Sequence, residues 1–311
     1  MKAAQFKQYG DPSVVVVTEA DKPTVGQGQV LVEVRAASLN PWDTAVRQGG
    51  AKDFMPLELP VTAGGDLAGI VTEAGPDVTQ FAVGDKVYGG AGVPGGSGAF
   101  AQFAVADAGH IAKAPVSLDF TQAAALPLVG SSAVQALTEH LQLQSGQKIL
   151  IHGGSGGIGS IAVQIAKHIG AYVATTVPTE ALELAKQLGA DEVIDYKTQD
   201  FTQLIRDYDA VFDTVGGEVF EKSLSVLRPG GTAVSMLGKV DESTAKEQNV
   251  TAITQSTRAT TERLDKLTGL VEQGAVQPSI GKIFPLDQVQ EAFQARESGK
   301  VTGKVVLKVK A

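Results

Sequence analysis

The segment Lys148-Ile-Leu-Ile-His-Gly-Gly-Ser-Gly-Gly-Ile-Gly159 decides the fold of the middle of the chain. Its pattern predicts a short buried strand that ends at His152, then a glycine-rich turn, then a helix over Ile158–Ile169. The glycines fit G-x-G-x-x-G, a pattern that indicates dinucleotide binding when a strand precedes it and a helix follows it. Both conditions are met here, by Gly154, Gly156 and Gly159.

The physical requirements of such a turn explain the glycines. The backbone must approach a pyrophosphate closely, which leaves no room for a Cβ, and the phosphates then lie on unpaired N–H groups at the positive end of the helix. A glycine-rich turn without a ligand and a mononucleotide site remain the alternatives. The predicted phosphate contacts are Gly153, Gly154, Ser155, Gly156, Gly157, Ile158 and Gly159.

Apolar runs of four to six residues alternate with helical patterns on both sides of this turn. Such alternation is typical of an α/β fold with a doubly wound parallel sheet. The predicted strands are Lys148–His152, Tyr172–Val177, Glu192–Tyr196, Tyr208–Thr214 and Gly231–Leu237. The predicted helices are Phe120–Glu139, interrupted at Pro127, then Ile158–Ile169 and Glu180–Leu188.

The first third of the chain has a different pattern. Strand-like segments are separated by glycine and proline turns, and no helical crossover fits between them, so we expect an antiparallel, barrel-like domain. After a helix over Leu286–Ser298, the segment Lys304–Lys310 is strand-like and is expected to return to that domain. The predicted domains are residues 1–118, completed by 285–311, and 119–284. The predicted strands of the first are Val14–Thr18, Val30–Ala36, Gly69–Glu73 and Phe100–Val105.

Composition excludes several function classes. The 311 residues carry a formal charge of −8 and no cluster of Lys and Arg, which argues against nucleic acid and anionic membrane as partners. No apolar run is long enough for a membrane helix, and the N-terminus does not have the pattern of a secretory signal. There is no cysteine, so disulfides, thiol nucleophiles and cysteine-based zinc sites are excluded. We therefore expect a cytoplasmic protein.

The choice of dinucleotide depends on the residues that follow the second and third strands of the sheet. The second strand ends at Thr175 and Thr176 without an acid, and the two hydroxyls could donate to a 2′-phosphate. Glu180 counts against a phosphate. Tyr196 and Lys197, after the third strand, are also predicted to contact the cofactor, and Lys197 could supply a positive charge. These residues favour NADP(H) and leave NAD(H) open.

Several segments in the same order resemble the medium-chain dehydrogenase/reductase superfamily, in its zinc-independent quinone oxidoreductase branch. The resemblance covers nearly the full length and implies a GroES-like barrel followed by a Rossmann domain, with an active site between them. The segments that carry it are Ala36–Asp43, Leu59–Val71, Gly84–Gly89, Ala123–Leu137, the glycine turn, Asp213–Gly216 and Gly303–Leu307.

The departures from the zinc-dependent relatives concern the metal ligands. Asn40 stands where those relatives have a cysteine ligand, and Gly64-Gly65-Asp66 stands where they have Gly-His-Glu. No convincing ligand set remains, so we expect no metal, and alcohol oxidation is disfavoured without a Lewis acid.

The resemblance also implies roles for single residues. Asn40 is placed beside the nicotinamide and the substrate, with a turn residue before Pro41 as the alternative, and Ser132 is the second catalytic candidate. Asp43 and Tyr88 are assigned to the substrate pocket, although a helix cap and strand packing are their alternatives. Lys304 is assigned to the cofactor. The loops Gly49–Met55 and Gly90–Gly98 are expected to shape the pocket.

The predicted function is hydride transfer from NADPH to a small-molecule quinone or enone. A non-catalytic dinucleotide-binding redox sensor or structural protein is the alternative, and a zinc alcohol dehydrogenase fails on its ligands. Gly231–Leu237 resembles the edge strand through which family members pair, so a homodimer is expected.

Overall fold

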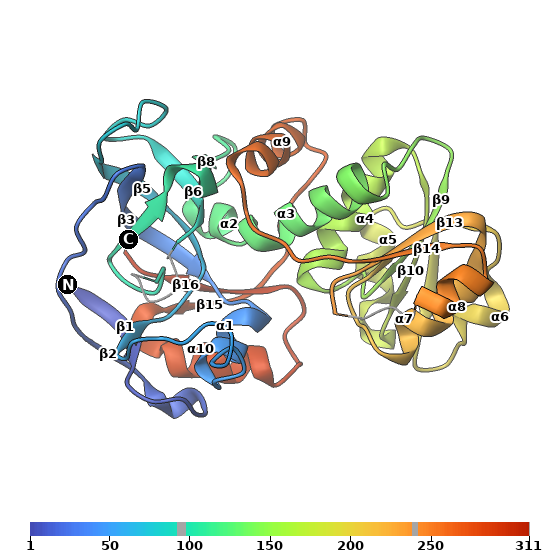
Figure 1. Ribbon diagram of the computed structural model, residues 1–311, viewed down its shortest axis with the longest axis horizontal. Coiled ribbons are helices and arrows are strands. Elements are labelled where there is room, and N and C mark those ends of the chain that lie inside the picture. Colours follow the sequence, from blue (N-terminus) through green and yellow to red (C-terminus); the bar gives the residue numbers. More distant parts are fainter. Residues whose placement is uncertain (92–97, 238–241, 311) are drawn as a thin grey trace. The chain divides into compact units, whose positions relative to one another are not determined.

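The computed structural model describes residues 1–91, 98–237 and 242–310. The chain forms two compact units, coloured along the sequence in Figure 1. Unit 1 comprises Met1–Ser131, Arg258–Glu272 and Pro278–Ala311, and unit 2 comprises Ser132–Thr257 and Gln273–Gln277. Among the described residues, no helix is both long and apolar enough to span a membrane.

Unit 2 contains a six-stranded parallel sheet in its described residues, in the order β11-β10-β9-β12-β13-β14. The order reverses beside β9, and in such sheets ligands bind at the carboxyl ends of the strands next to this reversal. The doubly wound sheet is therefore confirmed. The strands are β9 (Lys148–His152), β10 (Tyr172–Val177), β11 (Glu192–Asp195), β12 (Tyr208–Asp213), β13 (Leu227–Ser235) and β14 (Thr251–Thr254).

Helices connect these strands, as the crossovers of a parallel sheet require. The longest, α4, directly follows the glycine turn and ends at Gly170, whose φ of 92° closes the helix in the left-handed region. The helices are α4 (Gly157–Ile169), α5 (Leu182–Gln187), α6 (Phe201–Leu204), α7 (Glu218–Ser223) and α8 (Glu242–Glu247), and a π-helix (Gln135–His140) precedes β9.

Unit 1 is built on a seven-stranded, mainly antiparallel sheet in the order β15-β16-β3-β5-β6-β8, with β7 paired to β3, and on a smaller sheet β2-β1-β4. Only β15 and β16 pair in parallel within the described part of this sheet. The strands are β1 (Lys2–Phe6), β2 (Val15–Glu19), β3 (Gln29–Ser38), β4 (Val61–Thr62), β5 (Asp66–Ala74), β6 (Lys86–Gly90), β7 (Phe103–Asp107), β8 (Ile111–Lys113), β15 (Ile280–Pro285) and β16 (Lys304–Lys308).

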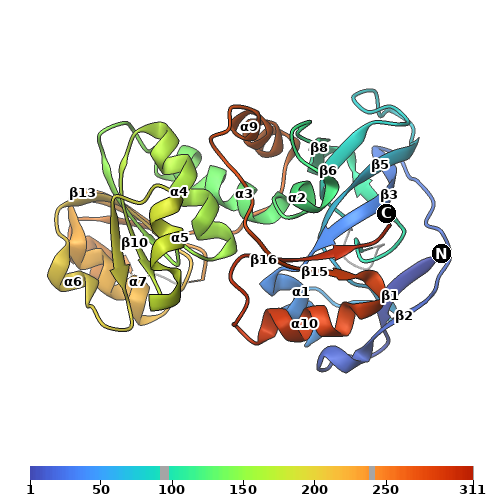
Figure 2. The same ribbon diagram turned by 180° about the vertical axis from the view of Figure 1, so that it is seen from behind.

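The last strand, β16, pairs with β3, so the chain's end returns to unit 1 as expected. The helix α10 packs against β2, β15 and β16, an arrangement that Figure 2 shows from behind. Its Phe293 lies edge-on to Phe100, with ring centroids 6.0 Å apart in the core. The helices of this unit are α1 (Pro41–Arg47), α2 (Phe120–Ala124), α9 (Thr261–Glu272) and α10 (Val289–Glu297), and α3 (Pro127–Val134) crosses the boundary between the units.

The structure divides the chain differently from the predicted boundaries at residues 118/119 and 284/285. Residues 119–131 belong to unit 1 because α2 packs against β3, β5 and β16. Residues 258–272 also belong to it, because α9 packs against β8 and the Tyr88 hydroxyl donates to the Leu264 carbonyl at 2.7 Å. Two helical segments, one before and one after residues 132–257 of unit 2, therefore pack on the barrel of unit 1.

Two predicted elements need correction. The strand predicted over Gly231–Leu237 is β13, and it is not at the edge of the sheet, because β14 pairs with its outer side. The helix predicted over Phe120–Glu139 is divided into α2, α3 and the π-helix.

Candidate functional site

The glycine turn lies between β9 and α4, at the carboxyl edge of the parallel sheet. The N–H groups of Gly153 and Gly154 both donate to the Thr176 carbonyl, at 3.1 and 3.2 Å, and thereby fasten the turn to β10. The first regular helix bond joins Ser160 N–H to the Gly156 carbonyl at 3.0 Å. In the described residues, the N–H groups of Gly157, Ile158 and Gly159 therefore have no partner, which suits an anion at this helix end.

The glycines of the turn serve different purposes. A Cβ on Gly154 would lie 2.0 Å from the Thr175 hydroxyl, and one on Gly159 would lie 2.2 Å from the Gly153 carbonyl, so the fold itself requires both glycines. Gly156 is exposed, has an ordinary φ of −78°, and its Cβ would meet only the Gly153 carbonyl at 3.2 Å. The fold therefore places little demand on Gly156, as expected where a ligand approaches the backbone.

The two threonines predicted to contact a 2′-phosphate are already used within the fold. Thr175 has no exposed surface, and its hydroxyl donates to the Ile151 carbonyl at 2.6 Å. The Thr176 hydroxyl lies 2.8 Å from Nδ1 of the buried His152, whose Nε2 lies 2.8 Å from the Ser223 hydroxyl.

The direction of these bonds follows from Ser223. Its hydroxyl donates to the Val219 carbonyl, so it can only accept from His152 Nε2–H. Burial lowers the pKa of His152 to about 4, so the neutral ring carries one N–H and its Nδ1 must accept from Thr176. The prediction that Thr175 and Thr176 donate to a phosphate is wrong for this arrangement, because neighbouring strands already use both hydroxyl protons.

Lys197 and Glu180 form an ion pair at 2.7 Å at this edge, where the carboxylate of Asp195 adds a second negative charge. Both side chains are largely exposed, and hydrogen bonding between them raises the pKa of Lys197 and lowers that of Glu180. Tyr196 is also exposed, beside this pair in the sequence. Lys197 is thus available to a phosphate only in competition with Glu180.

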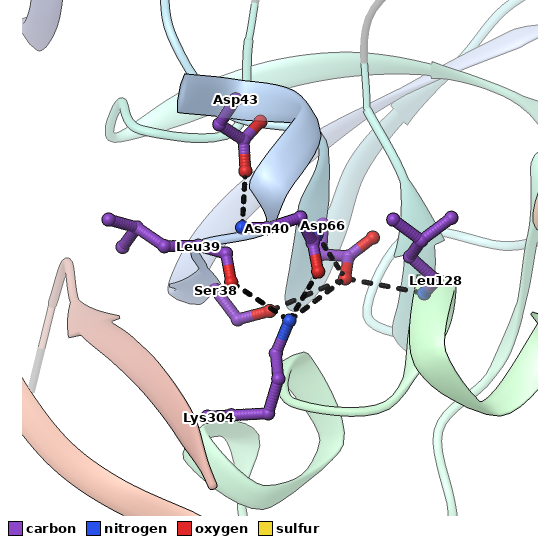
Figure 3. Close-up of polar contacts among 7 residues, drawn as sticks. All are labelled: Ser38, Leu39, Asn40, Asp43, Asp66, Leu128 and Lys304. Carbon is purple, nitrogen blue, oxygen red and sulfur yellow. Dashed lines mark hydrogen bonds and ion pairs between the residues drawn. The ribbon is translucent and has the colours of Figure 1, made fainter. Parts of the chain in front are cut away.

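Unit 1 holds a buried polar cluster around Asn40, shown in Figure 3. Asn40 precedes α1 and its backbone N–H donates to Asp43 at 2.7 Å, which holds the first turn of this helix. Its side-chain Nδ2 donates to Asp66 at 2.9 Å, and its Oδ1 accepts from Lys304. Asn40, Asp43, Asp66 and Lys304 are each at least 93% buried.

Asp66 and Lys304 also have further partners in this cluster. Asp66 Oδ2 accepts from the Ser38 hydroxyl and from the Leu128 N–H, each at 3.3 Å, and lies 4.0 Å from Lys304 Nζ. Lys304 Nζ donates to the Leu39 carbonyl at 3.0 Å. The prediction that Lys304 contacts the cofactor is therefore not supported, because burial and these bonds occupy its ammonium group.

Burial dominates the protonation of this cluster. It raises the pKa of Asp43 to about 7, with a smaller contribution from the charge of Asp66. Burial also raises the pKa of Asp66 and lowers that of Lys304, and in both cases the opposite charge of the partner resists the shift.

The other predicted residues fall elsewhere. Tyr88 has no exposed surface and bonds to Leu264 and Thr268 of α9, so it packs the fold and does not line a pocket. Ser132 is buried in unit 2, and its carbonyl accepts from Gln255 Nε2 at 3.0 Å. In the loop Gly49–Met55, Phe54 is 70% exposed beside Trp42. Of Gly90–Gly98, residues 92–97 lie outside the described residues.

Sequence reasoning missed Asp66 and Lys304 as partners of Asn40. Asp66 was considered only as part of Gly64-Gly65-Asp66, which replaces a zinc-ligand segment, and Lys304 was assigned to the cofactor. A signal was present in both places, because each charged residue begins a strand whose following residues are apolar. A charged residue at the start of a buried strand needs a hydrogen-bonded or oppositely charged partner, but the sequence does not identify that partner.

Two family models match the chain, "Alcohol dehydrogenase GroES-like domain" over residues 26–116 and "Zinc-binding dehydrogenase" over residues 188–307. A 2-methylene-furan-3-one reductase of Solanum lycopersicum is 36% identical over 99% of this chain and 79% of its own length. An NADPH-dependent alkenal/one oxidoreductase of Arabidopsis thaliana is 34% identical over the same shares.

Among solved structures, the quinone oxidoreductase from Coxiella burnetii superposes with a TM-score of 0.90 and 36% identity, over 100% of this chain and 99% of that one. The similarity thus covers both units, including the barrel, the parallel sheet and the returning strand. The chain belongs to the medium-chain dehydrogenase/reductase superfamily, in its quinone oxidoreductase branch.

Proposed function

We propose that this protein reduces quinones or α,β-unsaturated carbonyl compounds with NADPH and without zinc. The observation that carries the cofactor assignment is Gly156, an exposed glycine that the fold does not require, beside the partner-free N–H groups of Gly157, Ile158 and Gly159. This part of the turn would hold the pyrophosphate, and Lys197 would meet the 2′-phosphate.

The chemistry divides between cofactor and protein. NADPH supplies a hydride, and a proton from water completes the reduction. The protein's contribution is to bind the dinucleotide, hold the acceptor and stabilise the negative charge that develops on the acceptor oxygen. Quinones and enones spread this charge over a conjugated system, so one or two hydrogen-bond donors can replace a metal.

The acceptor class is supported by the relatives, whose names state reduction of a furanone, alkenals and enones, or quinones. The exposed side chains of Trp42 and Phe54, with ring centroids 6.1 Å apart and ring planes tilted by 36°, offer two aromatic faces in unit 1 on which a flat acceptor could stack.

Zinc independence rests on the donor set, although one matching family model is named for zinc binding. The chain has no cysteine, and its described residues contain no group of three His, Asp or Glu side chains that could hold a metal. Asn40 and Asp66 bond to each other and to Lys304, so they form an internal cluster that contains an ammonium group. A cation at this place would be opposed by Lys304.

The experiment is a panel of quinones, enones and acrylates, assayed with NADPH and with NADH after prolonged chelation. We expect oxidation of NADPH with at least one quinone or enone, unchanged by chelator or added zinc. A protein that binds NADPH but turns over no acceptor would be the non-catalytic alternative. Activity lost to the chelator and restored by zinc would overturn the zinc-free proposal.

A further inference from the structure

The side chain of Asn40 lies between two opposite charges in the buried cluster. Its Oδ1 accepts from the Lys304 ammonium group, and one hydrogen of its Nδ2 is donated to Asp66 at 2.9 Å (Figure 3). Turning the amide over would place its oxygen against the carboxylate and its N–H groups against the ammonium. The two charges therefore allow only one orientation of the amide.

One donor of Asn40 remains in this orientation. An asparagine amide has two N–H hydrogens, and the described residues provide a partner, Asp66, for only one of them. The bond from Lys304 draws electron density toward Oδ1, and hydrogen bonds that share a group in this way strengthen one another. The remaining N–H is thus both fixed in direction and a better donor than a free amide.

Burying the charges of Asp66 and Lys304 requires free energy for their desolvation, so stability alone does not explain this arrangement. Asp66 is 4% and Lys304 6% exposed, and well-packed apolar residues often stabilise a fold as much as a buried ion pair does. The cluster also draws on four separated segments, since Ser38 ends β3, Asp66 begins β5, Leu128 lies in α3 and Lys304 begins β16. The fold thus holds the Asn40 amide directly through Asp66 and Lys304, and Ser38 and Leu128 in turn hold Asp66.

We propose that Asp66 and Lys304 are positioning residues that hold Asn40 so that its remaining N–H donates to the carbonyl oxygen of the acceptor. The inference rests on the proposed function. Hydride adds to the acceptor carbon, the displaced electron pair moves to the carbonyl oxygen, and the Asn40 N–H stabilises that charge until water supplies a proton. Asn40 is then the catalytic residue of this step.

The first test observes the amide without any assay of activity. The side-chain N–H signals of Asn40 are identified by nuclear magnetic resonance through their loss in Asn40→Ala. We expect them to be well separated in the wild type, and to move together in the double variant Asp66→Asn/Lys304→Met. This double variant removes one negative and one positive charge together, so we expect it to fold even where a single change leaves a buried charge without its partner. Unchanged signals would overturn the positioning role.

The second test uses acceptors of graded reactivity. For Asp66→Asn/Lys304→Met, kcat/KM should fall by about tenfold or more for weakly activated enones and much less for quinones, while the KM for NADPH stays constant. Lys304→Arg keeps the charge and should recover part of the loss, and Lys308→Met, an exposed lysine of the same strand, is the matched control. An equal loss for every acceptor indicates a merely structural role and overturns the proposal.

The two tests separate this inference from the proposed function. A wild type that reduces no acceptor refutes the function and the catalytic part of the inference together. The resonance experiment still decides, in that case, whether Asp66 and Lys304 hold the amide.

Discussion

The three glycines of the turn differ in whether the fold itself requires a glycine at that position. Gly154 and Gly159 are fixed by contacts with Thr175 and Gly153, whereas nothing in the fold makes the same demand at Gly156. The sequence pattern treats the three alike, because it records spacing and not what surrounds each Cα. Because the structure shows what surrounds each glycine, a substitution at Gly156 can test ligand binding separately from folding.

Gly156→Val should lower NADPH affinity by more than about tenfold, because its side chain would occupy the place where the pyrophosphate approaches. The fold should survive, since an added Cβ would meet only the Gly153 carbonyl oxygen, at 3.2 Å, a tight contact that a shift of a few tenths of an ångström relieves. Fluorescence titration with NADPH and circular dichroism measure the two effects. Gly109→Val is the matched control, because nothing lies within 4 Å of a Cβ there. Unchanged affinity in folded Gly156→Val would reject the phosphate assignment.

The pair of Glu180 and Lys197 governs cofactor choice in this account. Glu180→Gln should free Lys197 for the 2′-phosphate and tighten NADPH binding by several-fold, and the gain should shrink in high salt because salt screens exposed charges. NADH lacks that phosphate and should bind as before. Titration of both cofactors at two salt concentrations measures the difference, and an equal change for both would place Glu180 away from the ribose.

The elevated pKa of Asp43 predicts a pH dependence of stability. The folded-state pKa of about 7 lies above the ordinary value near 3.9, so the stabilisation that Asp43 provides is complete below about pH 4 and is lost as the pH rises through 7. Asp43→Asn keeps an oxygen to accept from Asn40 N–H and does not titrate.

Urea unfolding at pH 4.5, 6 and 8 measures this effect. The free energy of unfolding of Asp43→Asn relative to the wild type should increase with pH, by about 1.4 kcal/mol for each pKa unit that the fold imposes. A difference that is constant with pH, or that decreases, would show that Asp43 ionises normally in the fold.

At the level of the elements, periodicity located most strands of the parallel sheet, because buried parallel strands are continuous apolar runs. It misassigned the edge of that sheet, since Thr251–Thr254 has two threonines and no long apolar run. Similarly, the sequence does not predict the hydrogen bonds of the Thr175 and Thr176 hydroxyls, because these bonds depend on how β10 lies beside β9. The partners of the two hydroxyls are Ile151 and His152.

The corrected edge strand carries the prediction of assembly. We predict a homodimer through β14, which within the described residues pairs on one side only. Thr251→Lys/Thr254→Lys should shift the mass measured by light scattering from twice 32.2 kDa to that of one chain, because a two-fold axis brings the lysines together. Leu204→Lys, an exposed residue of α6, should leave the dimer intact. A wild type that is monomeric at micromolar concentration would contradict the prediction.

For the whole molecule, several motif segments that occur in the same order as in the family predicted both the family and the two architectures. These segments contain the turns and the close contacts between backbone segments that this fold requires. The domain boundaries were not predictable, because α2 and α9 are helical in pattern yet pack on the barrel of unit 1. Nor was the cluster at Asn40 predictable, because Asn40 and Lys304 are 264 positions apart in sequence. Long-range pairing of polar groups leaves little trace in local patterns.

The proposed function depends on one step, the transfer of hydride from NADPH to the acceptor carbon. It is tested by supplying NADPH deuterated at the transferable position of its nicotinamide, separately for each face, with an enone that the protein reduces, and by mass spectrometry of the product. With one of the two labelled forms, the saturated product should carry one deuterium at the carbon β to its carbonyl. Product without deuterium from either form, or no product from any enone or quinone tested, would contradict the account.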